Sequence, residues 1–231
     1  MIPKIIWQTH EPEYSDLKDY QLNVISTWKN LNPGWEHRYV SAKERKETVK
    51  NFDSFLYECY LESNGVNQSD VWRLIAMYEH GGVYADMDSV CIMPIDDVIL
   101  KKYSGEEMIC TPPGYQTGMW DLCSNNANFA AVKNSTIIKS MLDKIIFKYK
   151  QTSCILELNG LELSSLHPGD PCWKIFCDIC IKNKDKILFN TDYSDHSGGY
   201  KTYFDKKMIV EYNNKKINYL ELCKNNNWSI Y

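Results

Sequence analysis

Two aspartates, Asp86 and Asp88, stand one residue apart directly after an apolar stretch that is predicted to form a strand. Side chains alternate between the two faces of a strand, so both carboxylates would lie on one side and Met87 on the other. Neighbouring carboxylates repel each other, and a divalent cation relieves the repulsion. Oxygen ligands favour Mg²⁺ or Mn²⁺, and Mg²⁺ keeps water and substrate phosphates in its shell. The triplet therefore predicts a site that holds a metal ion against a diphosphate.

The segment before this triplet is predicted to form a helix, a stop and a buried strand. Its apolar residues recur at helical spacing, and they are Val71, Leu74, Ile75 and Tyr78. Ser69 is a suitable N-cap, and Gly81 and Gly82 suit the end of a helix. Residues 83–85 would then form a buried strand that leads directly to Asp86.

Asp70 and Arg73 are three residues apart and therefore share one face of the predicted helix. Near a helix N-terminus, a carboxylate and exposed amide groups can hold the hydroxyl groups of a sugar. The alternative is a solvated ion pair, which is frequent on helix surfaces and contributes little to stability. The nearby pair of aspartates favours the binding role.

The whole segment resembles the sugar-binding region containing a DXD motif of the family 32 glycosyltransferases, and it is similar to the glucosyltransferase domains of large clostridial toxins. The residues that carry the resemblance are Ser69-Asp70, Arg73, Gly81-Gly82-Val83-Tyr84 and Asp86-Met87-Asp88. The opening residues 2–9, Ile-Pro-Lys-Ile-Ile-Trp-Gln-Thr, also resemble the first strand of that family. Initiating α-1,6-mannosyltransferases and capsular polysaccharide glycosyltransferases are members of this family.

The resemblance implies a GT-A fold, which is a single Rossmann-like mixed α/β sheet flanked by helices. It also implies transfer of a hexose from a nucleotide sugar with retention of the anomeric configuration. By matching positions, Asp88 would bind the metal directly, and Asp86 would contact the ribose and sugar, or the metal through water. Asp70 and Arg73 would hold hexose hydroxyls. The other residues expected at the donor nucleotide are Trp7, Gln8, Thr9 and Tyr84.

The second half of the chain contributes further candidates through the same resemblance. Asn125 and Asn126 resemble a segment near the reacting carbon, where an amide orients the acceptor or the sugar, although asparagines are also common turn formers. His196 is followed by Ser197, Gly198 and Gly199 in a segment that resembles a late loop, and it is expected to complete the metal shell. In the related toxins a C-terminal Ser and Trp close over the diphosphate, which makes Trp228 and Ser229 candidates for such a lid.

Length and composition are those of one globular domain. The chain has 231 residues, 44% of them hydrophobic, and is expected to form a single domain with a donor half at about 1–110 and an acceptor half at about 111–231. A net charge of −4 gives no general attraction to nucleic acid or to anionic membranes. The sequence shows neither an apolar run of membrane-spanning length nor a signal peptide, so a cytoplasmic enzyme with reduced cysteines is expected.

Other elements are expected at fixed places along the chain. These are a strand at 4–8, a helix at 17–31, a strand at 37–40, a helix opened by a Ser41/Glu44 capping box, a helix at 52–61, a strand at 108–111 and a helix at 137–149. Cys177 and Cys180 have the spacing of half a zinc site, but they share a helical face with apolar residues, which favours burial without chemistry.

The sequence thus favours a Mn²⁺- or Mg²⁺-dependent retaining hexosyltransferase that acts on a glycan or protein hydroxyl, with a UDP-sugar as the first choice of donor and a GDP-sugar as the second. Two alternatives remain. In a haloacid-dehalogenase-type phosphatase, Asp86 would be phosphorylated and Asp88 would act as acid and base. That motif normally opens its domain, whereas here it follows residues 1–85. The other alternative is a non-catalytic protein that binds sugar nucleotides or glycans.

Overall fold

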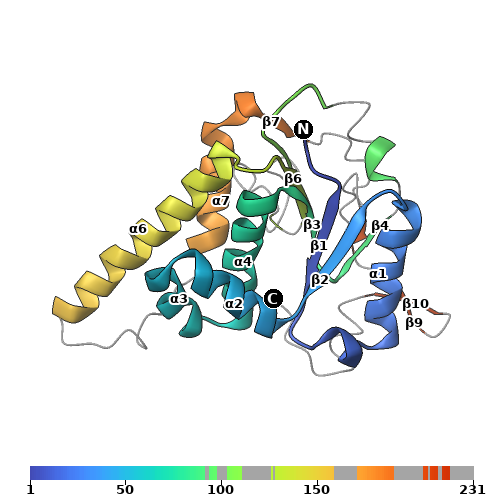
Figure 1. Ribbon diagram of the computed structural model, residues 1–231, viewed down its shortest axis with the longest axis horizontal. Helices are drawn as coiled ribbons and strands as arrows, with labels where there is room; N and C mark the ends of the chain where they lie inside the picture. Colours follow the sequence, from blue (N-terminus) through green and yellow to red (C-terminus); the bar gives the residue numbers. More distant parts are fainter. Residues whose placement is uncertain are drawn as a thin grey trace.

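A mixed sheet with helices on both faces forms the centre of the computed structural model (Figure 1). The residues that the structure describes are 1–91, 94–97, 103–110, 126, 128–158, 171–189, 205–207, 209–212 and 215–218. Within them, strands and helices alternate along the first half of the chain, as the α/β class predicted from the sequence requires.

The central sheet has six strands in the order β2-β1-β3-β6-β5-β7. They are β1 (Ile5–Thr9), β2 (Glu36–Val40), β3 (Gly82–Ala85), β5 (Met108–Cys110), β6 (Asn128–Ala131) and β7 (Ile187–Phe189). β1 is parallel to β2 and β3, whereas β6 is antiparallel to both of its neighbours, β3 and β5. The carboxyl ends of β1, β2 and β3 therefore meet the amino end of β6 at one edge of the sheet. Two short antiparallel pairs lie outside it, β4 (Ser89–Cys91) with β8 (Asp205–Lys207) and β9 (Ile209–Tyr212) with β10 (Lys215–Asn218).

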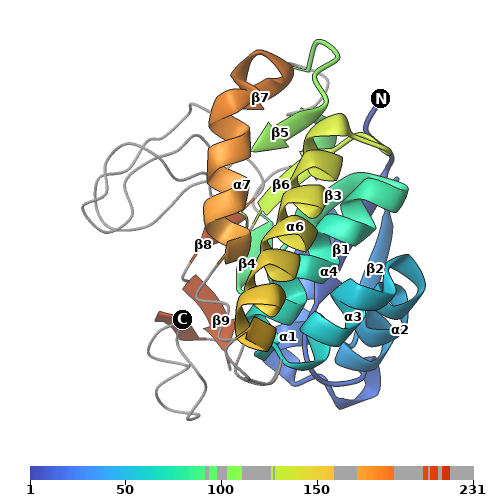
Figure 2. The same cartoon turned by 90° about the vertical axis from the view of Figure 1, so that its left-hand side faces the viewer.

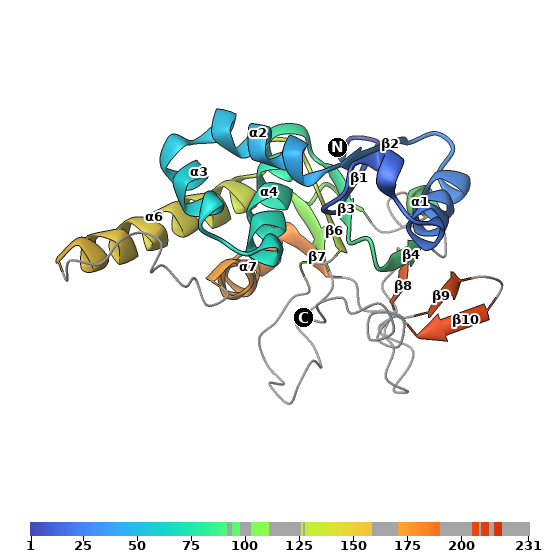
Figure 3. The same cartoon turned by 90° about the horizontal axis from the view of Figure 1, so that it is seen from below.

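Most of the described helices cover one face of this sheet. The helices are α1 (Asp19–Leu31), α2 (Ala42–Phe52), α3 (Ser54–Leu61), α4 (Gly65–His80), α6 (Thr136–Leu158) and α7 (Pro171–Lys182), with the 3-10 helices η1 (Tyr14–Asp16) and η3 (Lys184–Lys186). Helix α4 lies against β3 and β6, with α2, α3, α6 and α7 packed around it (Figure 2). Helix α1 lies on the other side of the sheet (Figure 3).

The two-residue period of the strands divides the apolar core into two layers. Trp7 of β1 and Tyr84 of β3 pack with the α4 layer. Their strand neighbours Ile6 and Val83 pack with α1 on the opposite face. All four side chains are at most 5% exposed. Because both layers are covered, β3 is buried along its whole length, and it can hold the following residues at a fixed depth.

Several predictions made from short stretches of the sequence are confirmed. Ser41 and Glu44 form the predicted capping box at the start of α2, each side chain accepting from the backbone amide of the other residue. Cys180 is a buried free thiol on α7, as its helical spacing predicts, and Cys172 is buried and free as well. The side chain of Cys177 lies outside the described residues. No helix in the described part of the chain combines the length and the apolar character that a bilayer span requires.

The predicted N-cap at Ser69 is wrong. Helix α4 begins earlier, at Gly65, because the side chain of Asn64 accepts a hydrogen bond from the amide of Asn67 and caps the helix there. The Ser69 hydroxyl instead donates to the carbonyl oxygen of Val66, one turn back. Asp70 and Arg73 consequently lie in the body of the helix and not among exposed amides at its end.

Two glycines connect α4 to β3 without a loop. Gly81 ends the helix at φ 69° and Gly82 opens the strand at φ 113°, values that residues with a side chain rarely adopt. A Cβ on Gly82 would lie 2.5 Å from the carbonyl oxygen of Ile5 in β1. The predicted glycine stop is thus confirmed, and it sets the helix that carries Asp70 directly before the strand that leads to Asp86.

Replacement of Gly82 by alanine is expected to lower the free energy of unfolding by more than about 2 kcal/mol, because it combines a positive φ with a backbone clash. Gly34→Ala is the matched control, since a Cβ at this exposed turn would meet nothing within 4 Å. Its change should stay within about 1 kcal/mol. Urea unfolding of both variants measures the difference, and similar losses in the two would contradict the steric argument.

Candidate active site

The Asp86-Met87-Asp88 triplet forms a tight turn between β3 and β4. Strand β3 ends at Ala85, and the amide of Ser89 donates to the carbonyl oxygen of Asp86 at 3.0 Å. The expectation that a strand period aligns the two carboxylates is therefore wrong, because the backbone leaves the strand before Asp86. Met87 does pack inward, 9% exposed, in a small apolar cluster with Leu17 and with Ile25 of α1. The turn places both aspartates at the carboxyl end of β3, where ligands bind in open α/β sheets.

A buried ionic cluster centred on Arg73 lies behind this turn. Arg73 Nη2 is 2.9 Å from Asp70 Oδ1 and 3.3 Å from Asp86 Oδ1. Tyr84 donates its hydroxyl to Asp86 Oδ1 at 2.6 Å, and the centre of its ring is 4.4 Å from the guanidinium carbon of Arg73. The side chains of Arg73 and Asp70 are 5% and 6% exposed, and that of Asp86 is 26% exposed. The alternative of a solvated ion pair is therefore wrong, because α4 is enclosed between the sheet and the other helices.

Asn126 reaches this cluster from a distant part of the chain. Arg73 Nη1 donates to the carbonyl oxygen of Asn126 at 2.7 Å, and Asn126 Nδ2 donates to Asp70 Oδ1 at 3.1 Å. Strand β6 begins shortly afterwards with Asn128, which is paired with Ala85 at the end of β3. The structure thus brings together five residues predicted from the sequence, namely Asp70, Arg73, Tyr84, Asp86 and Asn126.

The pKa values of Arg73 and Tyr84 are both raised within the cluster. Burial opposes the charge of Arg73, but Asp86, Tyr84 and Asp70 more than offset it, and the pKa of Arg73 is raised. Burial raises the pKa of Tyr84 well above its ordinary value, although Arg73 opposes the rise, so the phenol stays a neutral donor. One cation faces two carboxylates, Asp70 and Asp86, and this excess of negative charge beside Asp88 favours a bound cation.

The residue after the turn is held by contacts that sequence analysis missed. Trp28 Nε1, from α1, donates to the carbonyl oxygen of Ser89 at 2.7 Å. Asn128 Nδ2, from β6, donates to the Ser89 hydroxyl at 3.1 Å. Ser89 is fully buried. A polar residue inside an apolar strand usually has a specific partner, so Asn128 carried a signal that could have been found in the sequence.

Strand β1 ends beside the turn. Gln8 is fully buried, and its Nε2 donates to the carbonyl oxygen of Asp86 at 3.3 Å. Its Oε1 lies 2.9 Å from Nε2 of His37 in β2. Burial lowers the pKa of His37 to about 4, so this imidazole is neutral and can donate to Gln8. Of the residues predicted at the nucleotide, Gln8 therefore supports the backbone of the DXD turn.

Trp7 and Thr9 face the helical layer. The Trp7 ring is 5% exposed, donates Nε1 to the carbonyl oxygen of Gly81 at 2.9 Å and stacks on His80 with ring centres 5.4 Å apart. Gly81 precedes β3, at the end of that strand remote from the turn, so the indole points away from Asp86. Thr9 donates its hydroxyl to the carbonyl oxygen of Val40 at 2.6 Å. The contact of Trp7 with a donor base stays a prediction.

The carboxylates of Asp86 and Asp88 are hard oxygen ligands that suit Mg²⁺ or Mn²⁺. Within the described residues, no three His, Cys, Asp or Glu side chains gather in a way that could hold a metal ion. Two carboxylates fit a metal that takes its other ligands from phosphates and water. The remaining candidates lie outside the described residues, and they are Asn125, His196, Trp228 and Ser229.

The fold and the DXD segment are similar to those of GT-A glycosyltransferases. Residues 18–105 match the family model described as "Glycosyltransferase sugar-binding region containing DXD motif". This range contains α4, β3 and the Asp86-Met87-Asp88 turn. The segment that carries the DXD turn is therefore similar to that glycosyltransferase family, in agreement with the resemblance found in the sequence.

Known relatives agree with this assignment. The initiation-specific alpha-1,6-mannosyltransferase of Candida albicans is 31% identical over 114 residues, which are 46% of this chain and 28% of that protein. The chain thus spans well under half the length of this relative. Among solved structures, the PaToxG glycosyltransferase has a TM-score of 0.51 at 15% identity, over 78% of this chain and 69% of that one. The ligand-free glycosyltransferase domain of the YGT toxin has a TM-score of 0.50 at 10% identity, over 82% and 80%. These structures support the fold.

Replacement of Arg73 by methionine is expected to lower the free energy of unfolding by about 3 kcal/mol, because it leaves the buried Asp70 carboxylate without its cation. Adding Asp70→Asn to that variant should recover at least about 1 kcal/mol, since the uncompensated charge is then removed. Urea unfolding of the single and double variants measures the coupling. Losses that simply add would show that the two side chains do not form an energetic unit.

Proposed function

We propose that this chain transfers a hexose from a nucleotide sugar to a hydroxyl group of a glycan or protein, with a divalent metal ion and with retention of the anomeric configuration. A UDP-sugar is the first choice of donor, and a GDP-sugar is the second. The activity is a proposal for the chain as a whole, because its mannosyltransferase relative is much longer.

The observation that carries this proposal is the buried cluster around Arg73, placed directly behind the DXD turn. Burying an arginine and two carboxylates is costly unless the geometry is good, and an apolar replacement of such a group is often as stable. A helix that served only to stabilise the fold would not need such a buried ionic cluster. At the carboxyl end of β3, however, the cluster fixes Asp86 at the boundary between the core and solvent, where its 26% exposed side chain can meet a ligand.

Each residue then has a role that its position allows. Asp86 contacts the ribose and the sugar, and Asp70 with Arg73 and Asn126 presents oxygen and nitrogen atoms to hexose hydroxyls. Gln8 holds the backbone of the DXD turn from behind. Four further residues keep the roles predicted from the sequence. Asn125 orients the acceptor or the sugar, and His196 completes the metal shell. Trp228 and Ser229 close over the diphosphate. Trp7 is the weakest member of this set, because its ring is enclosed in the core.

The residues present fit a divalent cation. Asp88 and Asp86 would hold it, and when bound it neutralises the negative charge that develops on the departing diphosphate. The protein's own contribution is to hold the Asp86-Met87-Asp88 turn in place. Gln8, Tyr84 and Ser89 do so through bonds to the Asp86 backbone or side chain.

Retention is proposed because the buried carboxylate nearest the turn is already engaged and is not free to act as the general base that inverting transfer needs. Asp70 Oδ1 binds both Arg73 and Asn126, so it is poorly placed to take a proton from an acceptor hydroxyl. The acceptor hydroxyl would then attack from the face that the diphosphate leaves, and a phosphate oxygen would take its proton. The product is expected to have the anomeric configuration of the donor. NMR during turnover measures the configuration at the transferred anomeric carbon. An inverted product at early times would overturn this part of the proposal.

Donor binding is tested by thermal shift with UDP, GDP and their common hexose conjugates, each with and without Mn²⁺. A nucleotide at about 100 times its dissociation constant should stabilise the protein by about 2.7 kcal/mol, or on the order of 5 to 10 °C. Asp88→Ala should abolish the Mn²⁺-dependent part of the shift with little change in the melting temperature of the free protein, because Asp88 lies in a turn outside the core.

Asp185→Ala is the matched control, since this exposed aspartate lies in η3, next to β7 at the far edge of the sheet. It should retain the full shift. An unchanged shift in Asp88→Ala would overturn the metal role. If no nucleotide stabilises the wild type, while phosphate is released from a simple monoester, the phosphatase alternative replaces this proposal.

A further inference from the structure

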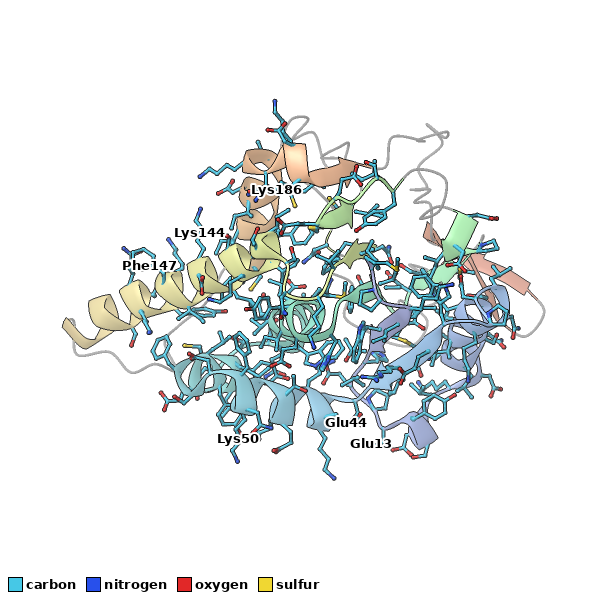
Figure 4. All side chains as sticks on the ribbon, turned by 45° about the horizontal axis from the view of Figure 1, so that its top comes forward. Glu13, Glu44, Lys50, Lys144, Phe147 and Lys186 are labelled. Atoms are coloured by element: carbon cyan, nitrogen blue, oxygen red, sulfur yellow. The ribbon has the colours of Figure 1, made fainter. Side chains whose placement is uncertain are left out.

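A second buried arginine, Arg45 of α2, lies under the carboxyl end of β1. Its side chain is 1% exposed, whereas its helix neighbours Glu44 and Lys50 project from the outer surface of α2 (Figure 4). Arg45 Nη1 donates to the Thr9 hydroxyl at 2.8 Å, and Nη2 lies 2.5 Å from Glu11 Oε1. A single guanidinium thus binds the last residue of β1 and the segment that leaves it.

The same glutamate also touches the start of α4. A Cβ placed on Gly65, the first residue of α4, would lie 3.1 Å from Glu11 Oε1. A carboxylate at this end of a helix is favoured by the exposed amides and by the helix dipole. The backbone of Glu11 is held as well, because its carbonyl oxygen accepts from the amide of Ala42 in α2 at 3.4 Å. Glu11 therefore connects β1, α2 and α4.

These elements carry the two sides of the donor site. Strand β1 delivers Gln8, which bonds to the backbone of Asp86, and helix α4 carries Asp70 and Arg73. Between Thr9 and Glu11 stands His10. Burial lowers the pKa of His10, and the charges of Glu11, Arg45 and Asp86 all act on it, which places this segment within electrostatic reach of the DXD turn.

Stability alone does not explain why an arginine is buried at position 45. Its Nε–H has no hydrogen-bond partner within the described residues, so the burial of the guanidinium is only partly compensated. Its ionic partner, Glu11, is 56% exposed, and an ion pair that is open to solvent contributes little. An apolar side chain of similar length would therefore be about as stable at this position.

We propose that Arg45 is a positioning residue of the donor site, which fixes the carboxyl end of β1 and, through Glu11, the start of α4. The nucleotide side and the sugar side of the site are thereby held at a constant separation. The effect of Arg45 on donor binding rests on the proposed function. The effect of Arg45 on the two segments is independent of any donor.

The first test needs no ligand. In Arg45→Met, amide hydrogen exchange should become at least about tenfold faster both at residues 9–11 and in the first turn of α4, because both lose the same anchor. Lys46→Met, an exposed neighbour on α2, is the control and should leave both segments unchanged. Unchanged exchange at the start of α4 in Arg45→Met would overturn the proposed connection.

The second test measures binding of UDP and of GDP, each with Mn²⁺, by calorimetry. For the nucleotide that binds the wild type, the dissociation constant should rise about tenfold in Arg45→Met, the effect of losing a charged hydrogen-bond anchor. In donor hydrolysis, KM for the sugar nucleotide should rise by a similar factor while kcat changes less than about twofold, since the chemical groups are untouched. Arg45→Lys should recover part of the affinity. A purely structural role would change the melting temperature and leave KM unchanged, and that result would overturn the proposal.

Glu11→Gln keeps the proposal testable if Arg45→Met does not fold. Glu11 is more than half exposed, so its replacement spares the core, and it should raise the same dissociation constant about threefold through the weaker anchor. Glu47→Gln on the exposed face of α2 is its control. Wild-type affinity in Glu11→Gln would overturn the proposal. If the wild type binds neither nucleotide, the proposed function fails, and hydrogen exchange still decides the positioning role.

Discussion

The buried charge of Arg73 is the constraint on which the site depends. A guanidinium with 5% exposure needs anions and acceptors on every side, and the chain supplies them from three elements. Asp70 comes from the same helix, Tyr84 and Asp86 come from the end of β3, and the carbonyl oxygen of Asn126 comes from the approach to β6. Each of these partners would be costly to bury alone, because an isolated buried charge loses its solvation. Together they fix the position of Asp86, whose side chain reaches solvent.

This constraint also explains why α4 is not an ordinary amphipathic helix. Its buried residues run almost without interruption from Asp70 to Met77, because the sheet lies on one side and α2, α6 and α7 on others. A helix enclosed in this way has no solvated face on which an Asp and an Arg could rest. Its end is set just as firmly, because Gly81 and Gly82 turn the chain directly into β3. The helix, the glycines and the strand thus act as one rigid support for the DXD turn.

The parts of this arrangement that are local in sequence could be predicted, and the parts that depend on distant contacts could not. The capping box at Ser41, the glycine stop and the burial of β3 each follow from a few neighbouring residues, and all are confirmed. The cap at Ser69 was wrong because a stronger cap, Asn64, stands one turn earlier. That Asp70 and Arg73 are buried and paired with Asn126, 53 residues beyond Arg73, follows from tertiary packing and not from local pattern. The orientation of Trp7 likewise depends on Gly81, far away in sequence.

The reversed strand β6 is what allows residues from the second half of the chain to enter the site. In a parallel sheet, every strand would begin at the edge opposite to Asp86 and end beside it. Because β6 is antiparallel to β3, it begins where β3 ends, with Asn128 opposite Ala85. Asn126, just before it, then meets Arg73, and Asn128 holds Ser89 directly after the DXD turn. One change of strand direction therefore brings Asn126, from the second half of the chain, to the side of the sheet where the DXD turn lies.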